Sequence, residues 1–207
     1  MKITEISPRT FFVNFETRQE LLKTFIRFQE YYESPEFKGK VFTVEEYAEW
    51  YVKAYKKESF TYYDDWSGCN VPSFVFEDFR KGKLNPLSER EEKLLSLLPN
   101  DGETYYVIGA FNGGRKDVVE HEKCHALYYT NKDYQEEVNQ TISKYDTEEV
   151  KSYIRELGYH ESVVLDEVHA YICATYEKLE EKKVNYPKQL KEELQELVNK
   201  FSYKEVA

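Results

Sequence analysis

The chain has 207 residues, of which 29 are basic and 39 acidic, and its formal net charge is −10. Apolar residues make up 41% and charged residues 33%, which indicates a folded protein with a sizeable core rather than a disordered one. The sequence has no basic stripe, which argues against a nucleic-acid partner. No apolar run approaches the ~18 residues of a membrane span, and no signal-like apolar core follows Met1.

The three cysteines, Cys69, Cys124 and Cys173, are widely spaced and odd in number. This usage is typical of reduced thiols, so we expect a cytoplasmic protein. The chain has only four histidines, and all of them lie between residues 121 and 169. The sequence leaves the oligomeric state open.

Residues 1–115 are predicted to form a mixed lobe. Phe11–Phe15 has the pattern of a strand, and residues 60–75 are expected to be irregular. Three capping patterns each predict the start of a helix: Thr17 with Glu20, Thr43 with Glu46, and Ser88 with Glu91. Tyr105–Phe111 is the clearest strand in the chain, and a turn with two glycines ends it.

Residues 116–207 are predicted to form a helical lobe. Helices are expected at 117–129, 132–144, 147–157, 161–183 and 188–202. The fold class that follows is α+β and mainly helical.

Residues 121–125 contain the pattern His-Glu-x-x-His on a predicted helix. Because residues four apart share one helix face, His121 and His125 can present two imidazole nitrogens to one cation. Glu122 lies ~100° around the helix, close enough to reach a metal-bound water without being a ligand. A shuffled chain of this composition would contain the pattern about once in a hundred trials.

A catalytic zinc site needs a third protein ligand. Glu167 is the best candidate, because the small Ala170 one turn later lets its helix approach the first helix closely. Asp166 and His169 are the alternatives. Cys124 lies inside the motif and projects to the other side of His121, which predicts a buried packing thiol.

The sequence His121-Glu122-x-x-His125 followed by Glu167-x-x-Ala170 resembles the gluzincins, a group of zinc metallopeptidases. The resemblance covers about residues 120–171. It implies a zincin-like fold in a single catalytic domain over 1–207, with the active-site helix between a small mixed lobe and a helical lobe that carries the metal. It implies a zinc ion held by His121, His125 and Glu167.

The resemblance also implies hydrolysis of a peptide bond in a protein or peptide substrate, with Glu122 as general base on zinc-bound water. Tyr105–Phe111 would be the cleft-edge strand that pairs with the substrate. The oxyanion needs a further donor, for which the candidates are His160, Tyr171, Tyr128 and Tyr129. Tyr171 stands where such families often have an aspartate that orients a ligand histidine.

Three other interpretations stay open. The chain can be a zinc-bearing regulatory or interaction module without proteolysis, in which a fourth protein ligand closes the site. It can be a helical binding protein in which the motif is accidental. It can also be a deformylase-like metal hydrolase with Cys69 as the third ligand, although the glycine-rich motif of those enzymes is absent.

Overall fold

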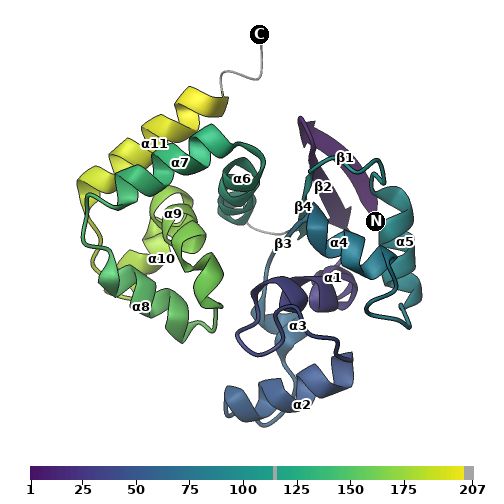
Figure 1. Cartoon of the computed structure of the whole chain (residues 1–207). Helices are drawn as coiled ribbons and strands as arrows, with labels where there is room; N and C mark the ends of the chain where they lie inside the picture. Colours follow the sequence, from purple (N-terminus) through teal and green to yellow (C-terminus); the bar gives the residue numbers. More distant parts are fainter. Residues whose placement is uncertain (114–115, 203–207) are drawn as a thin grey trace. The chain divides into compact units, whose positions relative to one another are not determined.

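The computed structural model describes residues 1–113 and 116–202, and the chain divides into two compact units, Met1–Arg115 and Lys116–Ala207 (Figure 1). The first unit contains a small sheet and several helices. Its elements are β1 (Lys2–Ser7), β2 (Thr10–Phe15), α1 (Arg18–Glu33), α2 (Val44–Ala54), α3 (Tyr62–Asp65), β3 (Cys69–Pro72), α4 (Ser73–Arg80), α5 (Glu89–Leu97) and β4 (Tyr106–Phe111).

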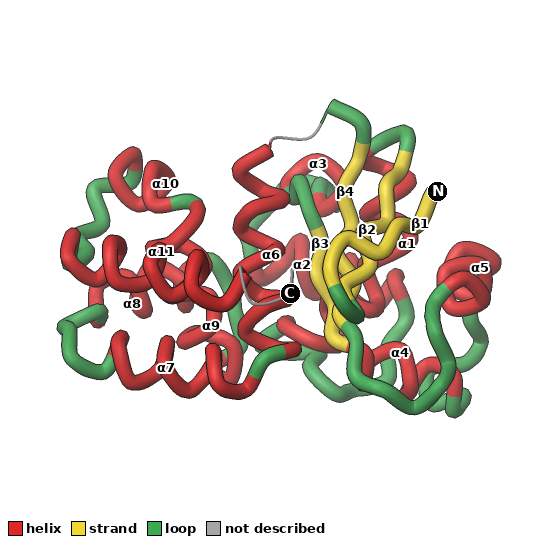
Figure 2. The backbone as a smooth tube through the Cα atoms, turned by 90° about the horizontal axis from the view of Figure 1, so that it is seen from above, coloured by secondary structure: helices red, strands yellow, loops and turns green. Residues whose placement is uncertain are grey.

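The sheet of the first unit has the strand order β1-β2-β4-β3, and Figure 2 shows its strands lying side by side. β4 pairs in parallel with β2 and antiparallel with β3, so both of its hydrogen-bonding edges are occupied. The prediction that Tyr105–Phe111 is an edge strand open to a substrate was therefore wrong. An apolar strand that is buried on both faces is typical of the interior of a sheet, and Tyr106–Ala110 is buried throughout.

The predicted helix starts of the first unit are confirmed. The Thr17 side chain accepts a hydrogen bond from the backbone N–H of Glu20. Thr43 with Glu46 and Ser88 with Glu91 form complete capping boxes, in which each side chain pairs with the other residue's backbone N–H.

The expectation that residues 60–75 are irregular was wrong. This segment contains α3, β3 and the first turn of α4. α3 and β3 have four residues each, too few for a periodic pattern to show in the sequence. The paired strand β1 was not predicted either, and most of its side chains are exposed.

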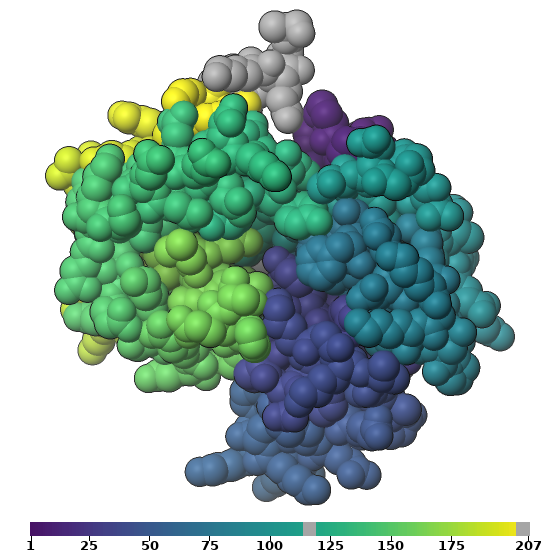
Figure 3. All heavy atoms as spheres, viewed as in Figure 1, coloured from purple at the N-terminus to yellow at the C-terminus, as the bar shows by residue number. Residues whose placement is uncertain are grey.

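The second unit is helical over its described residues. Its elements are α6 (Lys116–Thr130), α7 (Lys132–Ile142), α8 (Glu148–Glu156), the 3₁₀ turn η1 (Glu161–Val163), α9 (Val164–Ala174), α10 (Tyr176–Glu181) and α11 (Lys188–Ser202). α9 is the central helix, because α6, α7, α8, α10 and α11 all pack against it. Nine of its eleven residues are buried. Figure 3 shows the outside of this unit, with α7 and α8 in green and α11 in yellow.

The single helix predicted over 161–183 is in fact broken twice. η1 precedes α9, and Thr175 separates α9 from α10 with a non-helical backbone (φ −133°, ψ 33°). Neither glycine nor proline marks this break in the sequence. The described residues thus form a mixed, mainly helical α+β protein with a four-stranded sheet. None of the described helices is long and apolar enough to cross a membrane.

Candidate metal centre

Two helices of the second unit bring three metal-ligand side chains together. His121 and His125 lie one turn apart on α6, with their Nε2 atoms 3.1 Å from each other. Glu167 on α9 places Oε2 3.5 Å from His121 Nε2 and Oε1 3.5 Å from His125 Nε2. Four tetrahedral ligands at about 2.0–2.1 Å from a zinc ion are about 3.3 Å apart. The donor types and their spacing therefore fit one zinc ion, and the buried Oε2 of Glu167 has no hydrogen-bond partner.

The far sides of both imidazoles are held by polar groups. Thr175 Oγ1 lies 2.9 Å from His121 Nδ1, and Asp166 Oδ1 lies 3.0 Å from His125 Nδ1. Such outer contacts fix the ring orientation, so that Nε2 of each ring faces the other ligands. Asp166 thus lies behind a ligand histidine, and it is not one of the three residues that converge.

Thr175 was missed at the sequence level. Its hydroxyl reaches His121 because the backbone leaves the helical path between α9 and α10. No pattern in the sequence marks that break, so the contact became visible only in the folded chain.

Burial and neighbouring charges shift the pKa values of the three converging residues. Burial lowers the pKa of His121 well below its usual value, and the charge of His125 adds to this effect. Burial opposes protonation of His125 too, but the carboxylates of Asp166 and Glu167 raise its pKa well above the usual value. Burial raises the pKa of Glu167. The cluster thus retains protons that a metal ion would replace on binding.

Glu122 is buried beside the group, with 7% of its surface exposed. Its negative charge contributes to raising the pKa values of both His125 and Glu167, which places it within electrostatic reach of the proposed ligands. It is not one of the three converging residues. The role of Glu122 as a general base stays a prediction.

The four predicted oxyanion donors make different contacts in the second unit. The Tyr171 ring packs edge-on against His121, with ring centroids 5.0 Å apart, and burial raises the pKa of its hydroxyl. His160 caps η1, where its Nδ1 accepts a hydrogen bond from the backbone N–H of Ser162. Tyr128 donates to Asn139 over 2.7 Å, and Tyr129 is half-buried on α6. The ring contact with His121 makes Tyr171 the candidate that we carry forward.

The remaining alternative ligands lie elsewhere. His169 belongs to a second buried group, with Cys124 and Cys173. Cys69, the third ligand in the deformylase-like interpretation, is packed into the hydrophobic core of the first unit. Cys124 is buried, as predicted.

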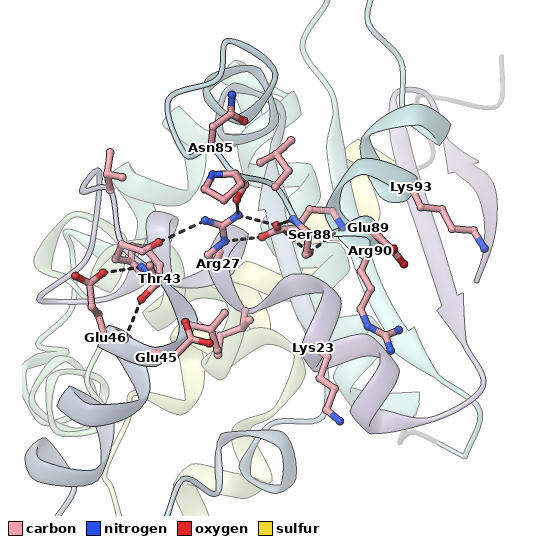
Figure 4. Close-up of a pocket in the computed structure, with 17 residues that line it drawn as sticks. Lys23, Arg27, Thr43, Glu45, Glu46, Asn85, Ser88, Glu89, Arg90 and Lys93 are labelled. Atoms are coloured by element: carbon pink, nitrogen blue, oxygen red, sulfur yellow. Dashed lines mark hydrogen bonds and ion pairs between the residues drawn. The ribbon is translucent and has the colours of Figure 1, made fainter.

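The first unit also contains a pocket of about 1020 Å³ next to α1, α2 and α5 (Figure 4). Its lining includes four basic and four acidic side chains, so it has no charge preference for a ligand. Arg27 lies at its centre between Thr43 and Ser88 in Figure 4. Its guanidinium donates two hydrogen bonds of 2.7 Å to Glu91 and others to the backbone oxygens of Leu84 and Pro86. These buried polar groups satisfy one another, and we assign the pocket no chemistry.

Comparisons of the chain with protein-family models, with curated proteins and with solved structures find no match. The assignment of a function therefore depends on the motif and on the geometry of the site.

Proposed function

We propose that the protein is a zinc-dependent peptidase with a zincin-like, gluzincin-type site, in which His121, His125 and Glu167 hold the ion. The observation that carries the proposal is the convergence of two imidazole nitrogens and one carboxylate at 3.1–3.5 Å inside the second unit. We propose a protein or peptide substrate. We also propose a cytoplasmic location, in keeping with three buried cysteine thiols.

In this proposal a bound zinc ion would act as a Lewis acid that polarises the scissile carbonyl and activates water near neutral pH. Glu122 accepts the proton of the attacking water and passes it to the leaving amine. Asp166 and Thr175 orient the two ligand histidines through their Nδ1 atoms. Tyr171 is proposed to donate to the developing oxyanion because it contacts His121, and His160 is a second candidate for that role.

The experiment that tests the proposal compares two neighbouring glutamates on α6. Glu122→Gln should still bind zinc. Its rate of hydrolysis of a peptide library should fall by at least about 10²-fold, because the proton acceptor is gone. Glu120→Gln is the matched control, since Glu120 is exposed and pairs with Lys123 on the outside of the helix. It should retain full activity. Zinc content is measured on each variant, and a chelator should abolish wild-type activity.

Two results would contradict the proposal. One is full activity of a zinc-loaded Glu122→Gln variant, which would exclude Glu122 as the base. The other is a wild-type chain that holds one zinc ion at these ligands and cleaves no member of the library.

A further inference from the structure

The buried group of Cys124, His169 and Cys173 lies between the same two helices as the proposed zinc ligands. Cys124 is on α6, and His169 and Cys173 are one turn apart on one face of α9. One ligand atom from each residue lies within 4.8 Å of the other two. All three side chains are buried, with exposed fractions of 5%, 0% and 7%. The Cys124 and Cys173 thiols hydrogen-bond each other.

Both ring nitrogens of His169 lie near polar side chains. Its Nδ1 lies 3.7 Å from Asp166 Oδ1, and its Nε2 lies 2.6 Å from the Tyr134 hydroxyl. A carboxylate behind the ring nitrogen that does not bind the metal is the usual arrangement for a zinc-bound histidine.

Asp166 faces both histidines through the same oxygen. Oδ1 is 3.0 Å from His125 Nδ1 and 3.7 Å from His169 Nδ1. One carboxylate therefore stands behind an imidazole of each group, and the two groups are distinct, with no ligand in common.

We infer that Cys124, His169 and Cys173 form a second metal site, which takes zinc or another thiol-preferring divalent ion and ties α6 to α9. Two thiolates with one imidazole are the soft donors that such ions prefer. In a tetrahedral site of this type the ligand atoms are about 3.5–3.8 Å apart. Their ligand atoms need to draw together by about 1.3 Å at most to reach this spacing. The site is independent of the proposed peptidase activity.

Cobalt titration of the reduced, full-length chain tests this inference, because cobalt bound by thiolate absorbs strongly in the near ultraviolet and cobalt bound by nitrogen and oxygen alone does not. The wild type should bind two Co²⁺ per chain and develop the thiolate-to-cobalt band. Cys173→Ser should bind one Co²⁺ and lose the band. Glu167→Gln should lose the other ion and keep the band. Cys69→Ser, which removes the buried cysteine of the first unit, is the matched control and should behave as the wild type.

A wild-type measurement covers the case in which Cys173→Ser does not fold. Cobalt should slow the alkylation of Cys124 and Cys173 and leave the alkylation rate of Cys69 unchanged. Peptide mapping measures the rate at each cysteine. Saturation of the wild type without a thiolate band would overturn the inference, as would a band that survives in Cys173→Ser. Neither result depends on hydrolysis, so a failed peptidase assay leaves this test intact.

Discussion

Asp166 immediately precedes the proposed ligand Glu167, yet the two carboxylates have different surroundings. Glu167 faces the Nε2 atoms of His121 and His125, whereas Asp166 faces Nδ1 of His125. Consecutive helix residues point about 100° apart, which allows one to bind a metal and the next to orient a ligand. In the proposed site, Asp166 orients His125. The resemblance to gluzincins gives an orienting role to an aspartate at the position where this chain has Tyr171.

Asp166→Asn should weaken zinc binding at the His121, His125 and Glu167 site by about 10–100-fold, because the carboxylate no longer holds His125. The affinity is measured by competition with a chromogenic chelator in the Cys173→Ser background, so that one site is titrated. Asp133→Asn makes the same chemical change on the exposed surface of α7 and should leave the affinity unaltered. An unchanged affinity in Asp166→Asn would show that Asp166 does not position His125.

Glu30 is a second residue whose surroundings change its chemistry. It is buried on α1 in the first unit, where the hydroxyls of Tyr62 and Tyr47 hydrogen-bond to its carboxylate. Burial raises its pKa from 4.5 to about 7, and the two tyrosines only partly oppose that shift. The folded state therefore binds a proton at Glu30 more tightly than the unfolded state does.

This shift predicts how stability depends on pH. The stabilising contribution of the Glu30 proton to the free energy of unfolding is fully present below pH 4.5 and is lost as the pH rises through about 7. The loss amounts to about 3 kcal/mol for a shift of this size. Glu30→Gln carries no such titration, so its free energy of unfolding should rise relative to that of the wild type between pH 4.5 and pH 8.

Urea unfolding followed by tryptophan fluorescence measures this difference, since both tryptophans, Trp50 and Trp66, lie in the first unit. Glu49→Gln, at an exposed position of α2, is the control and should show no pH-dependent difference. If the free energies of unfolding of the wild type and Glu30→Gln differ by a constant amount between pH 4.5 and pH 8, Glu30 does not have the raised pKa.

At the scale of elements, the contact between β4 and α1 is set by a glycine. A Cβ atom added at Gly109 would lie 2.7 Å from Leu21 Cδ1 and 3.0 Å from Phe25 Cε2. Leu21 and Phe25 have no exposed surface, so they have little room to move away. The absence of a side chain at Gly109 lets α1 lie directly on the sheet.

Gly109→Ala should therefore destabilise the first unit by about 1–3 kcal/mol through overpacking. The free energy of unfolding is measured by tryptophan fluorescence in urea. Adding Leu21→Val should restore part of the loss, because it removes the atom nearest to the new methyl group. If Gly109→Ala alone is as stable as the wild type, the close approach of α1 and β4 is contradicted.

At the scale of the whole molecule, all proposed zinc ligands lie in the second unit. A ligand that binds only the folded state stabilises it by about 2.7 kcal/mol at one hundred times its dissociation constant. Zinc should therefore slow amide hydrogen exchange in peptides from α6 and α9. Peptides from β2 and β4 should exchange at unchanged rates, and equal protection in both units would contradict this prediction.

Local patterns in the sequence were sufficient for much of the helical structure. The capping pairs at Thr43 and Ser88 predicted helix starts because a cap depends on residues three apart. The spacing of His121 and His125 predicted a shared helix face because residues four apart lie one turn apart on a helix. The short strand β3 escaped prediction because its partner β4 is distant in the chain. β1 escaped prediction because most of its side chains are exposed, so no apolar pattern marks it.

What the sequence determined by itself is therefore the pair of histidines, the neighbouring Glu122 and the predominance of helix, since each depends on contacts within one turn or on composition. Only the tertiary structure decided that Glu167 converges on the histidines, that Asp166 and Thr175 stand behind them, and that β4 is an interior strand. These facts depend on how α9 packs against α6 and how β4 pairs within the sheet. Such packing depends on residues more than thirty positions apart in the chain, which no local pattern records.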